Sequence, residues 1–220
     1  MNLNLPKGNG VDEDFGFRTE KSVLWERLQN LLLGCSILFW PLASWFRRDR
    51  SFDSSTTFLF ILNLIVGLLL VVRQPVRRRG SPRAILLSLP SVGVGVLTFQ
   101  LAPSLSDWPT LARGILAVGV LLAIWAFLTL GRNFAVLPAL RDVVTSGPYR
   151  FIRHPAYAGQ LLIAAACFAA QPSLLTMTPF ALSLPFALIR IHVEEPLLLT
   201  SPTYIEYTKT VPWRLLPRVW

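Results

Sequence analysis

The residues best suited to do chemistry are concentrated in one run, SGPYRFIRHPAYAG at 146–159. Pro155 suits the first turn of a helix, where its missing N–H leaves no bond unmade. The amides of that turn, with Arg153 and His154 beside them, predict a site for an anionic group. Gly159 lets a ligand or another backbone approach closely. Taken singly, the arginines are better explained as setting the membrane topology, His154 as a helix cap and Gly159 as a packing residue. Their concentration in one run favours a binding site.

A second cluster contains two adjacent carboxylates, Glu194 and Glu195, which follow an apolar run at 174–189. At the end of a helix they oppose its dipole, so cationic or hydroxylated partners are expected. An Arg190–Glu194 pair at i,i+4 has the weaker orientation and leaves Glu195 unpaired. Ionisable residues at membrane depth are candidates for a functional site.

The two clusters are predicted to meet. The apolar runs 155–170 and 174–189 are joined by a short Gln-Pro-Ser link, which predicts an antiparallel hairpin with both clusters on one side of a membrane. Beyond it, Ser201-Pro202 predicts the start of a short helix with Tyr204 and Tyr207 on one face. This helix is expected to lie at the interface and to cover a ligand.

The elements that must position these clusters are long apolar blocks. Of the 220 residues, 53% are apolar and 15% are charged, whereas soluble domains carry about 45–50% and about 25%. An ordinary soluble domain is therefore excluded, and an all-α, multi-pass transmembrane protein is predicted. Four spanning helices are expected at 28–46, 58–72 (extended by 54–57), 84–101 and 111–130. The two later runs of 16 residues each reach about 24 Å, so they predict a shorter C-terminal helical hairpin, followed by the interfacial helix.

This pattern predicts three regions. Residues 1–23 form a polar lead-in, residues 24–130 a scaffold of four transmembrane helices, and residues 131–220 the region that carries the candidate site. The lead-in lacks the basic start and apolar core of a signal peptide.

The formal charge of +9 belongs mainly to arginines that flank the apolar blocks. Nucleic-acid binding favours basic and aromatic residues interleaved on a solvated face, and that pattern is not found. With both termini in the cytoplasm, 17 of the 21 Lys and Arg residues fall on the cytoplasmic side, as the positive-inside rule predicts. In a bacterium the membrane would be the inner one. No metal site is predicted.

The polar residues of the C-terminal region resemble those of the isoprenylcysteine carboxyl methyltransferases and the related phospholipid N-methyltransferases, which are integral membrane proteins. The resemblance covers about residues 130–220. The family commonly has Phe-Gly where this chain has Thr200-Ser201-Pro202, and the Ser-Pro form is similar to the bacterial branch. The matching positions are Leu130-Gly131-Arg132-Asn133-Phe134, Gly147-Pro148-Tyr149-Arg150, Arg153-His154-Pro155, Tyr157, Gly159, Glu194-Glu195, Tyr204, Tyr207 and Val211-Pro212.

The resemblance implies S-adenosylmethionine as cofactor. Arg153 and His154 are expected to hold its carboxylate, and the glutamates its ammonium or ribose hydroxyls. A tyrosine is expected to face the sulfonium by cation–π attraction. Arg150 or Arg132 is expected to orient an acidic acceptor as the catalytic group. The full set of cofactor-binding residues that the resemblance implies is Tyr149, Arg153, His154, Pro155, Tyr157, Gly159, Glu194, Glu195 and Tyr204.

The function predicted from the sequence is methyl transfer to a lipophilic acceptor that enters from the bilayer, with carboxyl methylation of an isoprenylcysteine-like substrate favoured. The alternatives are N-methylation of an ethanolamine phospholipid, an NADPH-dependent sterol-type reductase with similar C-terminal tyrosines and proline, and a non-enzymatic scaffold or small transporter. The intact Arg-His-Pro run and the glutamate pair favour the methyltransferase. The oligomeric state is left open.

Overall fold

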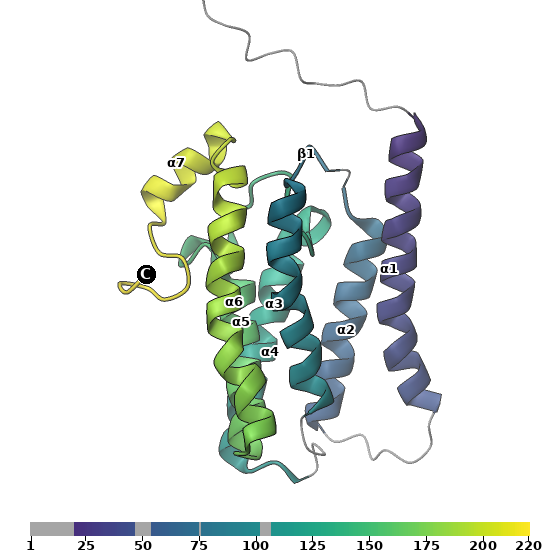
Figure 1. Ribbon diagram of the computed structural model, residues 1–220, viewed down its shortest axis with the longest axis vertical. Coiled ribbons are helices and arrows are strands. Elements are labelled where there is room, and N and C mark those ends of the chain that lie inside the picture. The colour runs from purple at the N-terminus through teal and green to yellow at the C-terminus, as the bar shows by residue number, and fades with distance from the viewer. Residues whose placement is uncertain (1–19, 47–53, 75, 102–106) are drawn as a thin grey trace, which may run out of the picture.

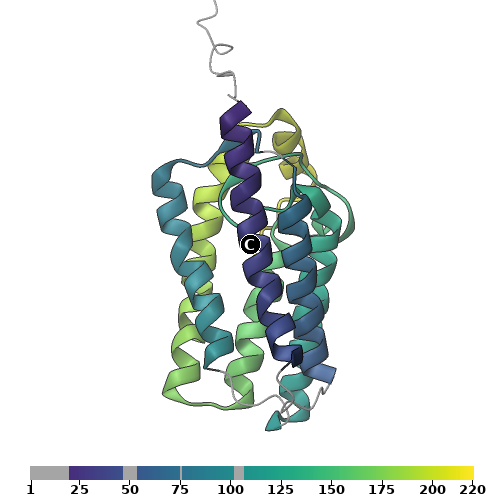
Figure 2. The same cartoon turned by 90° about the vertical axis from the view of Figure 1, so that its right-hand side faces the viewer.

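Six long helices run alternately up and down side by side (Figures 1 and 2). The computed structural model describes residues 20–46, 54–74, 76–101 and 107–220. A shorter helix, α7, lies across the end where α6 finishes (Figure 1). The helices are α1 (Glu20–Phe46), α2 (Ser54–Val72), α3 (Pro82–Gln100), α4 (Thr110–Leu130), α5 (Pro155–Ala170), α6 (Leu174–Leu198) and α7 (Pro202–Thr210).

Local sequence explains where several helices begin. Ser81 caps α3 by accepting from the amide of Ala84 at 3.2 Å, and Pro82 follows as the first helical residue. At the start of α6, Ser173 and Thr176 form a reciprocal capping box. Such caps satisfy amides that would otherwise lack a partner.

The helical fold class is confirmed, and the predicted apolar blocks recur as helices with shifted ends. α6 continues beyond the apolar run 174–189 to Leu198, so Glu194 and Glu195 lie near its C-terminal end, as predicted. Its charged residues stay helical because Arg190 and Glu194 pair on one face. The predicted lead-in at 1–23 lies largely outside the described residues, and α1 already begins at Glu20.

Among the described residues, two helices are long and apolar enough to cross a membrane, Thr110–Asn133 and Leu174–Leu198. The first is α4 together with the short 3-10 turn η2 (Gly131–Asn133). Three shorter apolar helices accompany them, Arg27–Phe39, Phe60–Val72 and Pro155–Ala170. These helices agree with the predicted membrane protein, while the number of spans and the depth of the hairpin stay predictions.

The polar segment between α4 and α5 is fixed to the end of α2. A two-residue antiparallel ladder pairs β1 (Arg78–Arg79) with β2 (Ala139–Leu140). The Arg132 Nε donates to the Val72 carbonyl at 3.2 Å, and the Arg141 Nε donates to the Gln74 carbonyl at 3.0 Å. Basic side chains at a helix C-terminus satisfy its free carbonyls and its dipole.

Candidate functional site

Glu195 is the centre of a buried charge cluster that joins three parts of the chain. Its Oε1 lies 2.8 Å from the Arg153 Nη1 and 3.4 Å from the His154 Nε2, both just before α5. Its Oε2 lies 2.8 Å from the Arg214 Nε, in the segment after α7. The Arg153 and Glu195 side chains are 7% and 6% exposed. The two clusters predicted to return to one side therefore meet directly.

Glu194 is held separately. The predicted i,i+4 pair forms, with the Arg190 Nε 3.0 Å from the Glu194 Oε1. The Tyr157 hydroxyl, from α5, donates to the same carboxylate at 2.6 and 2.7 Å. Arg190 also lies over the Tyr157 ring at 4.9 Å and donates to the Val136 carbonyl. The tyrosine thus strengthens a pair whose orientation alone is weak.

The segment after α7 is tied to the Arg-His-Pro run through the backbone. The amides of Arg153 and His154 donate to the carbonyls of Trp213 and Arg214, each at 2.9 Å. Inside α5 the Tyr157 and Ala158 amides donate to the His154 carbonyl. These four amides already have partners, so the expectation that free amides at this helix start receive an anion does not hold for them.

A cavity of about 480 Å³ opens beside the two clusters. Its volume falls within the range of small-molecule sites. One end is polar, and the other runs between the helices of the bundle among apolar side chains. The polar end includes Arg153, His154, Tyr157, Arg190, Glu194 and Tyr204, and the apolar end includes Ile37, Leu62, Val92, Ala123, Phe127 and Ile163.

Three residues that line this cavity contribute buried polar atoms without a hydrogen-bond partner among the described residues. They are the Arg153 Nε, the Tyr204 hydroxyl and the Asn133 Oδ1. Buried polar atoms are rarely left unpaired, so this group indicates a polar ligand. Asn133 was not among the predicted site residues, although the Gly131-Arg132-Asn133 lead-in contained the signal.

The tyrosines at this end are neutral donors. Burial, with the nearby Glu195 carboxylate, raises the pKa of Tyr204 to about 12. Burial likewise raises the pKa of Tyr149 and of Tyr207 above the ordinary value. The Tyr207 hydroxyl donates to the Tyr149 carbonyl at 2.5 Å. Because all three phenols stay protonated near neutral pH, the Tyr204 hydroxyl is available to donate to an anionic group.

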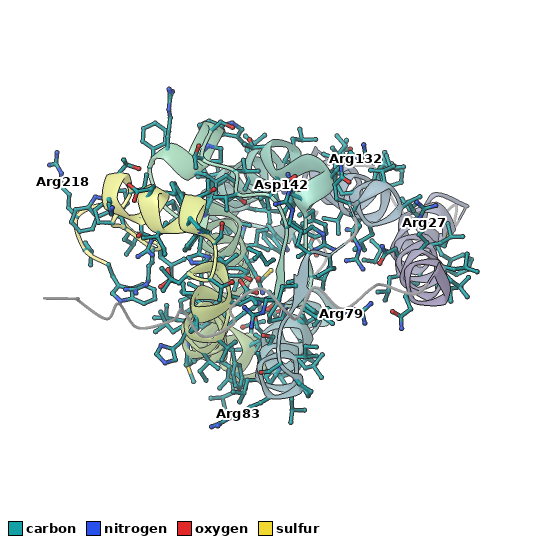
Figure 3. The ribbon with its side chains drawn as sticks, turned by 90° about the horizontal axis from the view of Figure 1, so that it is seen from above. Arg27, Arg79, Arg83, Arg132, Asp142 and Arg218 are labelled. Atoms are coloured by element: carbon teal, nitrogen blue, oxygen red, sulfur yellow. The ribbon has the colours of Figure 1, made fainter. Side chains whose placement is uncertain are left out.

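Neither arginine predicted to be catalytic lies at the cavity. Arg132 is exposed on the outer side of the bundle (Figure 3), and its side chain caps α2. Arg150 is exposed, and its guanidinium lies 5.8 Å from the Phe151 ring. Neither residue lines the cavity. Arg190 is buried and lines the cavity, as Arg141 and Arg153 do, although spacing alone had presented it as a simple ion pair.

Replacing Arg132 by alanine therefore tests its position directly. We expect the melting temperature to fall by about 2–4 °C, because a hydrogen bond to the end of α2 is lost. We expect kcat/KM to stay within about twofold of wild type. Thermal unfolding in detergent and steady-state kinetics measure the two effects. A large loss of kcat/KM at unchanged melting temperature would restore the catalytic role.

Gly159 lies at a close helix contact. A Cβ on Gly159 would lie 2.8 Å from the Gly119 carbonyl oxygen and 3.0 Å from the Ala123 amide nitrogen of α4. Gly159 therefore permits the close approach of the α4 backbone. A contact with the cofactor is not needed to explain a glycine at this position. Pro155, in contrast, occupies the first position of α5 as predicted, and it is fully buried.

Gly159→Ala is expected to lower the free energy of unfolding by about 1–3 kcal/mol, because the added methyl group must displace backbone of α4. Gly114→Ala is the matched control, since a Cβ there meets nothing within 4 Å. That variant is expected to gain about 0.5–1 kcal/mol from helix propensity. Unfolding of both in the same detergent checks the difference, and equal stability would contradict the close contact.

Residues 112–200 match the family described as the isoprenylcysteine carboxyl methyltransferase (ICMT) family. The family resemblance predicted from the sequence is thereby confirmed over these residues, which include α5, α6, Arg153, His154, Glu194 and Glu195. The family match indicates a membrane methyltransferase. A search among curated proteins finds no match.

Proposed function

We propose that this chain methylates a lipophilic acceptor using S-adenosylmethionine. The premise is the match of residues 112–200 to the isoprenylcysteine carboxyl methyltransferase family. Carboxyl methylation is the favoured reaction. When bound, the cofactor supplies an electrophilic methyl group on a sulfonium.

The observation that carries the proposal is the set of unpartnered polar atoms around the cavity. The Arg153 Nε can donate a hydrogen bond, the Asn133 Oδ1 can accept one, and the Tyr204 hydroxyl can do either. S-adenosylmethionine has a carboxylate, an ammonium group and hydroxyls, so it presents the complementary groups. The donor set therefore fits this cofactor.

Each side chain has a distinct role in this proposal. Arg153 and Tyr204 would hold the carboxylate, as charge-assisted hydrogen bonds favour. Asn133 and Glu194 would accept from N–H or O–H groups. The face of Tyr157 already contacts the Arg190 guanidinium at 4.9 Å and the His154 ring at 5.5 Å.

The sulfonium is therefore better placed against Tyr149 or Tyr204, both of which line the cavity. Glu195 does not line it. Its role in the proposal is to orient Arg153 and His154 rather than to touch the cofactor.

The charge clusters favour a carboxylate over an amine as acceptor. A carboxylate attacks as it stands, whereas an ammonium group must first lose a proton. Both Glu194 and Glu195 are already bound by arginines. Neither is therefore free to act as the base that phospholipid N-methylation requires.

The apolar end of the cavity suits the lipid part of the acceptor. Its lining comes from α1, α2, α3, α4 and α5, so an acyl or prenyl chain from the bilayer could occupy it. In this proposal the polar end faces the cytoplasm together with both termini, and membrane lipids surround the bundle. The reductase alternative requires a nicotinamide, and the scaffold alternative leaves the unpartnered polar atoms unexplained.

The test is transfer of a labelled methyl group from S-adenosylmethionine by the purified protein. N-acetyl-S-farnesylcysteine and phosphatidylethanolamine serve as the two acceptors. We expect a base-labile ester on the first and no product on the second. N-methylated phosphatidylethanolamine as the sole product would overturn carboxyl methylation, and NADPH binding without methyl transfer would overturn the reaction class.

A further inference from the structure

Gln160 is a polar residue on the face of α5 that lines the cavity. The residues of α5 that line the cavity are Ala156, Tyr157, Gln160 and Ile163, a spacing that places them on one helix face. Along this face the side chains become less polar. Tyr157 has a hydroxyl bound to Glu194, Gln160 has an uncharged amide, and Ile163 is apolar. Gln160 therefore lies where the polar end meets the apolar end, about 7.5 Å along α5 from Pro155.

The orientation of the Gln160 amide is fixed by its neighbours on α3. Its Nε2 donates to the Ser91 carbonyl at 3.4 Å, and only the NH₂ group of the amide can donate there. Gly95 provides the room, because a Cβ at that position would lie 3.2 Å from the Nε2. No hydrogen bond to the amide oxygen is found among the residues that the structure describes, and the Gln160 side chain is partly exposed at the cavity wall.

We infer that Gln160 is a specificity-determining residue, whose amide oxygen accepts a hydrogen bond from an N–H or O–H of the acceptor where its polar head joins its apolar tail. A polar group placed in an apolar passage is unfavourable unless a ligand pairs with it. An acceptor without such a donor leaves the oxygen unpaired, which is how a binding site rejects a close analogue. The inference rests on the proposed function and specifies its substrate class further.

Three probes with the same farnesyl thioether and carboxylate test this inference. They carry an acetamido group, a hydroxyl or a hydrogen on the carbon next to the carboxylate. Binding to the full chain in detergent is measured by isothermal titration, so the readout does not require turnover. Wild type is expected to bind at least one donor-bearing probe about five- to thirtyfold more tightly than the hydrogen analogue.

Gln160→Leu is expected to abolish that difference while it leaves S-adenosylhomocysteine binding unchanged. Gln171→Leu, the same change at an exposed position between α5 and α6, is the matched control and should retain the difference. Equal or absent binding of the three probes by wild type, or a difference that survives in Gln160→Leu, overturns the inference. Absence of S-adenosylhomocysteine binding by wild type would instead contradict the proposed function, so the two failures are distinguishable.

Discussion

Glu195→Ala is expected to destabilise the protein by about 3–5 kcal/mol, because it leaves the buried Arg153 guanidinium without its carboxylate. Arg153 loses its partner at 2.8 Å, and Arg214 loses the contact that connects the segment after α7 to α6. Binding of S-adenosylhomocysteine should be lost with it, since Arg153 is no longer oriented toward the cavity. Chemical unfolding and isothermal titration in the same detergent measure both effects.

Two further variants separate loss of charge from loss of shape. Glu206→Ala removes an exposed carboxylate whose one ion pair among the described residues is with Lys209, and it should change stability by no more than about 0.5 kcal/mol. The double variant Glu195→Gln with Arg214→Gln removes one charge of each sign, and it should recover part of the lost stability. Wild-type stability and binding in Glu195→Ala would show that the cluster is not structural.

Arg190→Met is expected to lower kcat/KM by about 100-fold or more, because a small displacement of positioning groups has effects of that size. The Arg190 guanidinium contacts the Glu194 carboxylate, the Tyr157 ring and the Val136 carbonyl. Its loss leaves the half-buried Glu194 carboxylate with the Tyr157 hydroxyl as its other partner among the described residues, and it also releases the Val136 segment that lines the cavity. Steady-state kinetics with varied acceptor and cofactor measure the effect.

Arg190→Lys keeps the charge but not the planar fork, so it should recover only part of the activity. Arg83→Met is the matched control on an exposed face (Figure 3) and should behave as wild type. Near-normal kcat/KM in Arg190→Met, with loss of activity in Arg132→Ala or Arg150→Ala, would contradict this prediction. It would support the acceptor-orienting role predicted for the two exposed arginines.

Local sequence signals predicted the parts of the site that lie on single elements. Pro155 predicted the start of α5, and the spacing of Tyr204 and Tyr207 predicted a shared helix face. The Arg190–Glu194 pair followed from i,i+4 spacing alone. These predictions succeeded because a helix fixes the distances between neighbouring turns.

The partners that come from distant segments could not be predicted in this way. Arg214 follows Glu195 by 19 residues, with α7 between them, and no periodicity relates the two. Asn133 and Gln160 reach the same cavity from different helices. The final residue of α6, Leu198, was not predicted, because hydropathy marks only the apolar run 174–189.

The most direct test of the central claim is equilibrium binding of S-adenosylhomocysteine to the purified wild-type protein and to Tyr204→Phe. The variant removes only a buried hydroxyl that meets the geometry of no hydrogen bond among the described residues, although Arg153 lies close to it, so it should fold normally. We predict saturable one-to-one binding by wild type and about five- to thirtyfold weaker binding by Tyr204→Phe. Absence of binding by wild type, or equal affinity of the two proteins, would contradict the assignment of the cofactor to this cavity.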